Sequence, residues 1–406
     1  MGYTKTGLAG IGWMGSFRLF SRILAFLRII ILARLLTPFQ FGVLGIATLT
    51  LSFLETITET GIGVVIIQEK ENLEKYIDTA WLISILRGVL IFFIIFLSAS
   101  LVSTFFNSEE SVILIRLIAL VALIRGFINP ARSTLIKDLK FKGEFIISSI
   151  VLIVDLTFTL FFTIILKNPI SLVYGLIFGA ITEVVLSFLM LSLKPTLSFN
   201  KYNLKSITNR GKWVTLSSIF NFLFTDGDDA LVGKLMEKSS LGIYQVAYKI
   251  STLPLTEVTN VMNTVSFPIF VKISEDRNRL LKAFSKTLIV TIMLIFPVGL
   301  IIYFFPEMIV KILLGDMWYG VIPILKSLAV FGVLRSIVIA CNPLFHSLKL
   351  QKYVTLYTFT ALFVMASTIY PLTINYGLNG TVYSVLLGTV ASLLLNIFNI
   401  FRIFRS

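Results

Sequence analysis

The sequence has little of what soluble enzymes use for chemistry. It contains one histidine and one cysteine among its 406 residues, and charged residues make up 14% of the chain. One histidine cannot form a histidine-cluster metal site, and one cysteine cannot form a disulfide within the chain. Soluble domains carry roughly 25% charged residues. The composition therefore excludes an ordinary soluble enzyme, and we expect no metal and no cofactor.

The chain is rich in apolar residues instead. Hydrophobic residues make up 56% of it, including 36 phenylalanines, and the mean hydropathy is +0.93. The apolar residues gather into about twelve stretches, each long enough for a membrane span of roughly 20 residues. This pattern predicts an all-α integral membrane protein. The spans are expected near residues 11–35, 41–67, 78–105, 112–130, 145–166, 169–193, 213–235, 241–268, 283–306, 319–346, 353–374 and 378–401.

The lysines and arginines indicate the orientation of the predicted spans. The net charge is +14, and most of the cations in loops fall in every second loop. Cation-rich loops are cytoplasmic in membrane proteins, so both termini are expected in the cytoplasm. The excess charge then reflects topology and attraction to anionic membrane lipids, and it does not indicate a nucleic acid partner. The opposite set of loops holds only Arg34, Lys167, Lys234, Lys238 and Lys311.

The second half of the sequence repeats features of the first. Trp13 aligns with Trp213 at an offset of 200 residues, and Asn129-Pro130 aligns with Asn342-Pro343 at an offset of 213. A parallel repeat of this kind predicts two six-helix lobes related by a pseudo-two-fold axis along the membrane normal, with a central cavity between them. We expect an N-terminal lobe at 1–193, a basic cytoplasmic linker at 194–212 and a C-terminal lobe at 213–406.

Ionisable residues lie within the predicted spans, where a charge on a lipid-facing helix costs roughly 2.5–3.5 kcal/mol. Most of them must therefore face a watery cavity, pair with one another or lie near an interface. Guanidinium groups bind phosphate in a planar fork and keep their charge when dehydrated. The cations thus suit a phosphate-bearing substrate. The candidate substrate-binding residues are Arg18, Arg22, Arg28, Arg87, Arg125, Lys249 and Arg335.

Arg18 and Arg22 are the strongest of these candidates. They are four residues apart and so share a helix face, where their mutual repulsion favours an anionic ligand between them. Arg28 lies roughly 80° around the helix from Arg18. The alternatives are that these arginines lie near the cytoplasmic interface, or that they pair with Glu55 and Glu59.

Four acidic residues are candidates for coupling transport to an ion. Glu55 and Glu59 are four residues apart on one predicted span, and two close carboxylates out of bulk water favour retention of a proton. The alternative is a salt bridge to the first span. Asp226 and Asp229 share a face of the span that corresponds to the first one, where arginines stand instead. For these two residues, the alternative is a turn at a helix break.

Motifs spread over nearly the whole chain indicate a known family. They are Leu32–Pro38 with Phe41-Gly42, Glu59–Gly63 leading to Ile67-Gln68, Pro130–Arg132 with Lys140–Lys142, Asp228–Lys234 with Leu241–Tyr244, Phe267-Pro268 and Gly315–Trp318. This set resembles the Wzx-type polysaccharide flippases of the multidrug/oligosaccharidyl-lipid/polysaccharide (MOP) exporter superfamily. The motifs are mostly structural, so they indicate the family better than the substrate.

The resemblance implies a MATE-like fold in the bacterial plasma membrane. It implies export of an undecaprenyl-pyrophosphate-linked oligosaccharide, such as an O-antigen or capsule repeat unit, by alternating access. Polysaccharide polymerase and chain-length enzymes are then the expected protein partners. Two alternatives stay open: a multidrug or cation antiporter of the same fold, and a membrane-embedded polymerase or glycosyltransferase. The predicted loops are too short for the large external catalytic loop that such an enzyme needs.

Overall fold

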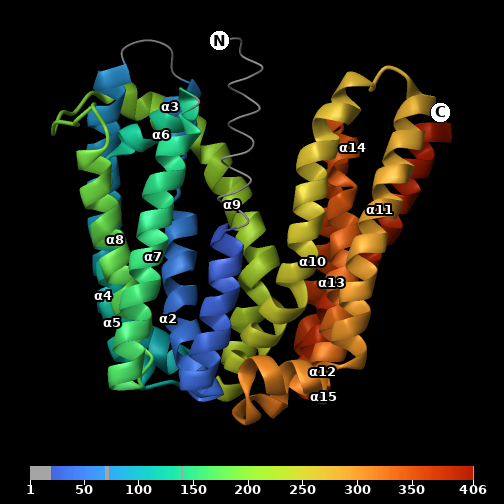
Figure 1. Ribbon diagram of the computed structural model, residues 1–406. Coiled ribbons are helices and arrows are strands. Elements are labelled where there is room, and N and C mark those ends of the chain that lie inside the picture. The colour runs from blue at the N-terminus through green and yellow to red at the C-terminus, as the bar shows by residue number, and fades with distance from the viewer. Residues whose placement is uncertain (1–19, 69–72, 139, 406) are drawn as a thin grey trace. The chain divides into compact units, whose positions relative to one another are not determined.

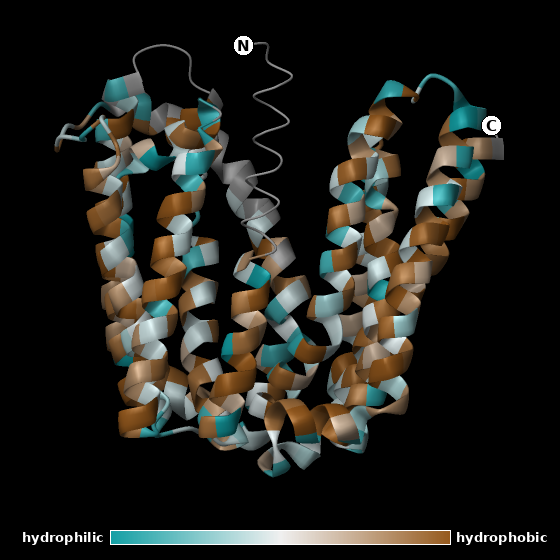
Figure 2. Ribbon diagram, in the orientation of Figure 1, coloured by the Kyte–Doolittle hydropathy of each residue, from teal (hydrophilic) through white to brown (hydrophobic). Residues whose placement is uncertain are grey.

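The computed structural model describes residues 20–68, 73–138 and 140–405. Within these residues every regular element is a helix, so the predicted all-α class is confirmed. The apolar composition accounts for this result, because a helix satisfies its backbone hydrogen bonds internally where no water is present. Hydrophobic residues follow the helices along much of their length (Figure 2).

Figure 1 shows the order of the helices along the described residues. A helix over residues 20–35 comes first among the described residues. It is followed by α2 (Pro38–Ile57), α3 (Ile62–Gln68), α4 (Leu73–Phe105), α5 (Ser111–Arg125), η1 (Pro130–Arg132), α6 (Ser133–Lys137), α7 (Phe141–Leu166) and α8 (Ile170–Leu189). The later elements are α9 (Lys201–Leu235), α10 (Lys238–Lys272), α11 (Arg277–Phe304), α12 (Pro306–Ile309), η2 (Val310–Leu314), η3 (Asp316–Val321), α13 (Ile322–Ala340), α14 (Asn342–Ser347) and α15 (Gln351–Arg405).

Several of these helices are suited to a membrane. Within the described residues, seven segments are long and apolar enough to cross it. The bent pair Ser111–Arg125 and Pro130–Lys137, which meet at 67°, makes an eighth if it counts as one span. The chain is therefore a multi-pass membrane protein. The number of about twelve spans stays a prediction.

Contacts between residues divide the chain into two compact units. Unit 1 consists of Met1–Leu36 and Gln40–Leu223, and unit 2 consists of Thr37–Phe39 and Phe224–Ser406. The predicted linker at 194–212 overlaps α9, which begins at Lys201. The second part of that linker is therefore helical rather than a loop.

Helices of unit 1 approach closely where glycines lie between them. In Figure 1, α7 and α8 lie side by side. A β-carbon on Gly175 of α8 would lie 1.9 Å from Thr159 Oγ1 and 2.7 Å from Asp155 Oδ1. A β-carbon on Gly88 of α4 would lie 2.9 Å from the α-carbon of Gly126, which follows α5. Small residues of this kind let membrane helices pack backbone to backbone.

Unit 2 is organised around α13, which packs against α10, α11 and α15. A β-carbon on Gly332 of α13 would lie 2.9 Å from the carbonyl oxygen of Ser251 on α10. Helix α15 turns at Gly377, whose φ of +60° favours glycine. Its two halves then meet, because a β-carbon on Gly380 would lie 1.9 Å from the carbonyl oxygen of Leu372. A buried cluster completes this unit: Phe270, Leu280, Phe284, Val338, Cys341, Leu344, Phe345 and Tyr357.

The structure corrects the predicted second span. A single span over 41–67 is wrong, because α2 ends at Ile57 and α3 begins at Ile62. Gly61 between them has a φ of +63°, a left-handed conformation that commonly ends a helix. Glu59 lies in this break, so it does not share a helix face with Glu55.

Helix boundaries recur at the predicted offset of 200 residues. The first described helix ends at residue 35 and α9 ends at Leu235, while α2 begins at Pro38 and α10 begins at Lys238. Positions 28 and 228 therefore occupy corresponding places in these two helices. The residues there are Arg28 and Asp228.

Candidate functional site

Arg28 and Asp155 form an ion pair inside unit 1. Nη1 of Arg28, on helix 20–35, lies 2.6 Å from Oδ2 of Asp155 on α7. Nη2 of Arg28 donates to Thr159 Oγ1 at 3.2 Å, and the Thr159 hydroxyl donates to Asp155 Oδ1 at 3.2 Å. The Arg28 and Asp155 side chains are only 18% and 12% exposed. This candidate cation therefore already has an anionic partner within the chain.

Arg87 and Arg125 both reach the C-terminal end of α2. Arg125 donates from Nη1 to both carboxylate oxygens of Glu55, at 2.9 and 3.2 Å. Arg87 donates to the carbonyl oxygen of Glu55 at 2.5 Å and to the Thr58 hydroxyl at 3.0 Å. Cations compensate the partial negative charge at a helix C-terminus. Glu55 is thus bound by α4 and α5, and a salt bridge from Glu55 to the first span stays a prediction.

Arg132 of η1 is the centre of a second polar cluster in unit 1. It donates to both carboxylate oxygens of Glu144 on α7, at 3.0 and 2.6 Å. It also donates to Glu183 of α8 and, at 2.6 Å, to the Ser148 hydroxyl. A guanidinium fork with two carboxylates is a strong, directional arrangement. The cluster fastens the bend between α5 and α6 to α7 and α8.

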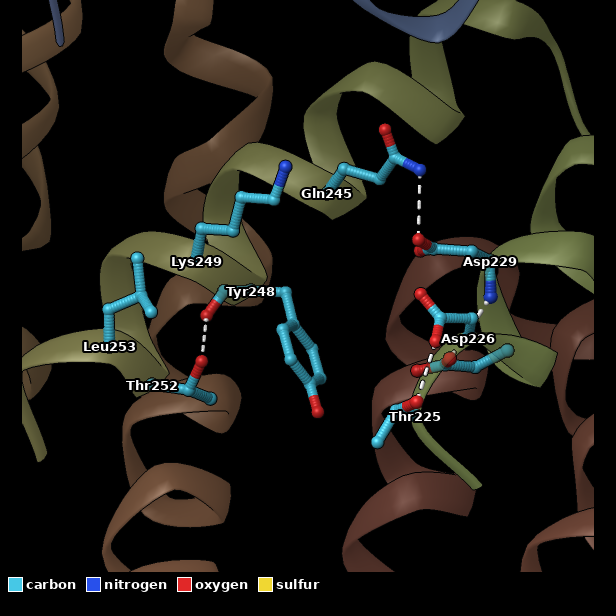
Figure 3. A pocket seen from close by; sticks show the side chains of 9 residues that line it. Thr225, Asp226, Asp229, Gln245, Tyr248, Lys249, Thr252 and Leu253 are labelled. Atoms are coloured by element: carbon cyan, nitrogen blue, oxygen red, sulfur yellow. Dashed lines mark hydrogen bonds between the residues drawn. The ribbon is translucent and has the colours of Figure 1, made fainter. Parts of the chain in front are cut away.

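A pocket in unit 2 gathers the acidic residues of α9 (Figure 3). Its volume is about 150 Å³, and all of its lining residues come from α9 and α10. Asp226, Asp228 and Asp229 line one side of it. Helix α9 runs unbroken through these residues, so the alternative of a turn is wrong. The other lining residues are Thr225, Gln245, Tyr248, Lys249, Thr252 and Leu253.

Each carboxylate in this pocket accepts a hydrogen bond from an uncharged side chain. Asp228 is almost fully buried, at 2% exposed. Carboxylates accept hydrogen bonds and repel anions, so the pocket suits a proton, a small cation, an amine or a hydroxyl group rather than phosphate. Within the described residues, no group of three or more His, Cys, Asp or Glu side chains is arranged to hold a metal ion. The three bonds are Tyr244 Oη to Asp228 Oδ2 at 2.6 Å, Gln245 Nε2 to Asp229 Oδ2 at 2.8 Å, and Thr225 Oγ1 to Asp226 Oδ2 at 2.6 Å.

Arg335 of α13 is held by aromatic side chains. Its guanidinium carbon lies 5.3 Å from the ring centre of Phe224, 5.9 Å from that of Tyr248 and 5.6 Å from that of Phe331. It also donates to the Tyr248 hydroxyl. Such contacts attract a cation to the ring faces. Because Tyr248 lines the acidic pocket, Arg335 fixes one wall of that pocket.

The remaining predicted site residues fall in different places. Arg18 lies outside the described residues. Arg22 has an exposed side chain on helix 20–35, and Lys249 has an exposed side chain at the pocket of unit 2. Lys249 lines the same pocket as Asp226 and Asp229, so the structure brings these three predicted residues together.

Sequence reasoning did not select several residues that the structure brings into these sites. Asp228, Tyr244 and Gln245 belong to the acidic pocket or its support, and Arg132 organises unit 1. One signal was present for the pocket. Asp228 and Tyr244 both lie in motifs that carry the family resemblance, and they are 16 residues apart, as are Asp229 and Gln245.

In the part of the chain that the structure describes, helices with apolar spans and internal ion pairs define a polytopic membrane protein. The chain belongs to the family described as polysaccharide biosynthesis protein, which matches residues 31–323. The match covers well over half of the 406 residues. The predicted relationship to Wzx-type proteins is thereby confirmed.

Individual relatives agree with this assignment. The chain is 26% identical over 381 residues to an uncharacterized membrane protein in the cps region of Klebsiella pneumoniae, covering 93% of this chain and 78% of that protein. It is 24% identical over 339 residues to the lipopolysaccharide biosynthesis protein WzxC of Escherichia coli (strain K12), covering 83% of this chain and 69% of that protein.

Solved structures agree in fold. The lipid II flippase MurJ in an inward closed conformation matches with a TM-score of 0.78 at 16% identity, covering 95% of this chain and 87% of that one. An inward-facing multidrug resistance MATE family transporter of the MOP superfamily matches with a TM-score of 0.74 at 16% identity, covering 94% of each chain. The predicted MATE-like fold is confirmed.

Proposed function

We propose that this protein is a flippase that moves a lipid-linked oligosaccharide, a precursor of a surface polysaccharide, across the membrane. The observation that carries the proposal is the match of residues 31–323 to a polysaccharide biosynthesis family. The likeness of the whole fold to a lipid flippase supports it. The protein acts as a transporter and not as an enzyme.

The substrate is proposed to be an oligosaccharide on undecaprenyl pyrophosphate. Its pyrophosphate is bound by cations of the predicted set, for which a guanidinium fork is well suited. Arg18 and Arg22 are proposed as the first contacts, because the exposed Arg22 side chain is accessible to a ligand. Arg28, Arg87, Arg125 and Arg335 each have internal partners, and for these the role in binding is indirect or depends on a change of partner.

Coupling to an ion is proposed for the acidic pocket of unit 2. Asp226 and Asp229 were selected from the sequence, and Asp228 joins them in the same cavity. Glu55 is a weaker candidate because its carboxylate is bound by Arg125. Glu59 is a weaker candidate because it lies beyond the end of α2.

The transport cycle is proposed to be alternating access between an N-terminal lobe at 1–193 and a C-terminal lobe at 213–406. We propose further that the protein lies in the bacterial plasma membrane with both termini in the cytoplasm. Reporter fusions after Phe141, Asp276 and Gln351 should then report the cytoplasm, and a fusion near Asn168 should report the outside. Polysaccharide polymerase and chain-length enzymes would act on the exported product.

The decisive experiment is deletion of the gene in the organism that carries it. Loss of surface polysaccharide together with accumulation of lipid-linked oligosaccharide on the cytoplasmic leaflet is the expected result. Plasmid-borne wild-type protein should restore export, as should the matched control Lys140→Ala, because Lys140 has an exposed side chain in a loop. Accumulation of free sugar nucleotides without any lipid-linked oligosaccharide would contradict the proposal, since the block would then precede the flipping step.

A multidrug or cation antiporter of the same fold is the second candidate function. The observation that favours it is the pocket of unit 2, where three carboxylates face a single lysine. An antiporter of this kind should extrude a cationic dye from energised vesicles. Dye efflux that is lost in Asp229→Asn, with surface polysaccharide intact in the deletion strain, would favour this candidate over the flippase.

A further inference from the structure

The two side chains of the Arg28–Asp155 ion pair differ in how freely they can move. Asp155 lies where glycines of α8 bring that helix close to α7. A β-carbon on Gly175 would lie 2.7 Å from Oδ1 of Asp155, and a β-carbon on Gly179 would lie 3.1 Å from the β-carbon of Asp155. The carboxylate is therefore confined between two backbones. Arg28 reaches it from another helix, through a long side chain with several rotatable bonds.

Thr159 forms hydrogen bonds with both Arg28 and Asp155, and it can keep the bond to Asp155 if Arg28 moves away. Its Oγ1 accepts from Arg28 Nη2 at 3.2 Å and donates to Asp155 Oδ1 at 3.2 Å. If the Arg28 side chain moved away, the Asp155 carboxylate would keep the hydrogen bond from Thr159. Arg28 would keep neither contact. The arrangement thus holds Asp155 in place and leaves Arg28 as the partner that can exchange.

No other acid of the two packed helices is available to Arg28 in its place. The remaining acidic residues of α7 and α8 are Glu144 and Glu183, and both bind Arg132. An anion is the strongest partner for a guanidinium withdrawn from water, because an unpaired charge is strongly unfavourable there. Arg28 is therefore expected to leave Asp155 most readily when another anion takes over the guanidinium.

We propose that Asp155 is an internal substitute for the phosphate of the substrate, which occupies Arg28 until a phosphate-bearing ligand displaces it. The proposal rests on the proposed flippase function. The incoming ligand is a pyrophosphate or phosphate ester, whose oxygens match the guanidinium fork that Asp155 and Thr159 now occupy. When the ligand leaves, Asp155 recovers Arg28, so the competing carboxylate also promotes release.

The test measures binding of inorganic pyrophosphate to the purified full-length protein in nanodiscs, by isothermal titration calorimetry. Asp155→Asn keeps the shape of the side chain but removes its charge, so Arg28 loses its internal competitor. Coupling between sites of this kind is typically worth a factor of about 5–150, and the variant should bind pyrophosphate at least about fivefold more tightly than the wild type. The matched control is Asp138→Asn, which removes an aspartate that is 46% exposed in a loop and should leave the affinity unchanged.

Two further variants keep the test decisive if Asp155→Asn does not fold. Arg28→Gln should weaken pyrophosphate binding, because it removes the guanidinium group that binds the phosphate oxygens. The double variant Arg28→Gln with Asp155→Asn contains no uncompensated charge, and it should bind as weakly as Arg28→Gln alone. The proposal is overturned if Asp155→Asn binds no more tightly than the wild type, or if the double variant binds as tightly as the wild type.

Failure of this proposal is distinguishable from failure of the proposed function. A protein that restores export in the deletion strain but whose pyrophosphate affinity is insensitive to Asp155 is a flippase in which this ion pair is structural. A protein that never restores export while lipid-linked oligosaccharide is absent from the deletion strain is not the flippase, whatever its affinity for pyrophosphate.

Discussion

Positions 28 and 228 correspond in the two units, yet they carry opposite charges and are stabilised in different ways. Arg28 in unit 1 is neutralised by a carboxylate, at 2.6 Å from Asp155. Asp228 in unit 2 accepts its hydrogen bond from an uncharged group, the Tyr244 hydroxyl, at 2.6 Å. A corresponding place in a repeated fold does not determine the charge that it holds. The comparison shows that unit 1 pairs its internal cation with an acid at this position, whereas unit 2 places a carboxyl group with an uncharged donor beside a cavity.

The same contrast extends beyond these two residues. In unit 1, Arg125 binds Glu55, and Arg132 binds two glutamates. In unit 2, Arg335 lies among aromatic rings, and the pocket carboxylates accept from Tyr, Gln and Thr side chains. Unit 1 thus holds its internal charges in ion pairs, whereas the pocket of unit 2 suits protons, cations or hydroxyl groups.

The largest effect is expected in unit 1, at the cluster around Arg132. Arg132→Ala leaves Glu144 and Glu183 as neighbouring carboxylates without their cation, and breaking such a buried arrangement destabilises by about 3–5 kcal/mol. Fluorescence-detected gel filtration after heating should show little folded protein. A melting temperature equal to that of the wild type would mean that ion pairing does not stabilise unit 1.

Alanine substitutions at two glycines test how tightly the helices are packed in each unit. Gly175→Ala in unit 1 places a methyl group 1.9 Å from Thr159 Oγ1, so overpacking should lower stability by about 1–3 kcal/mol. Gly227→Ala in unit 2 is the matched control, because nothing lies within 4 Å of its added β-carbon. The control should be neutral or slightly stabilising, since alanine favours a helix by about 1 kcal/mol over glycine. Equal melting temperatures for the two variants would contradict the difference in packing.

The Tyr244 hydroxyl, which donates to Asp228 in unit 2, should make a smaller contribution to the free energy of unfolding. Tyr244→Phe removes one hydrogen bond from Asp228, whose Oδ1 still accepts from the Asp229 backbone at 3.1 Å. Loss of a bond to a charged group costs about 1.5–3 kcal/mol, and we expect the lower part of that range. A double-mutant cycle with Asp228→Asn measures the coupling directly. Additive effects in that cycle would show that the two side chains do not stabilise each other.

The smallest effect is expected for an ion pair at the surface of unit 1. Lys140 and Asp138 are 3.2 Å apart, but their side chains are 67% and 46% exposed. Exposed pairs are worth about 0–1 kcal/mol, so Lys140→Ala should melt within a degree or two of the wild type. A drop in melting temperature comparable to that of Arg132→Ala would mean that solvent exposure does not explain the different strengths of the two ion pairs.

Much of the fold could be predicted from hydropathy alone. The predicted spans at 145–166 and 283–306 lie close to α7 and α11, because a long apolar run satisfies its backbone hydrogen bonds within the membrane by forming a helix. The break between 374 and 378 was also predicted, and Gly377 lies in it. The predicted second span is too long, because the apolar run at 62–67 follows closely on α2 and conceals the break at 58–61, where Gly61 has a φ of +63°.

The partners of the charged residues could not be predicted in the same way. The sequence marks Arg28, Arg125 and Glu55 as unusual, but it does not say which helices meet. The pairing of Arg28 with Asp155 depends on the close contact of α7 and α8 at Gly175, which is a property of packing and not of composition. Arg132 falls between the predicted spans 112–130 and 145–166, where a cation needs no explanation, and its contacts with two glutamates depend on the packing of the helices.

The turn at Gly377 has a practical consequence for engineering the chain. Its φ of +60° and the 1.9 Å approach at Gly380 leave no slack between the halves of α15, and insertions are tolerated best at exposed, loosely held loop tips. An epitope tag or a fluorescent protein placed after Tyr376 would have to separate two helices that touch at their first turn. Residues 196–200, between α8 and α9, form an exposed non-helical loop and are the better position for such a probe.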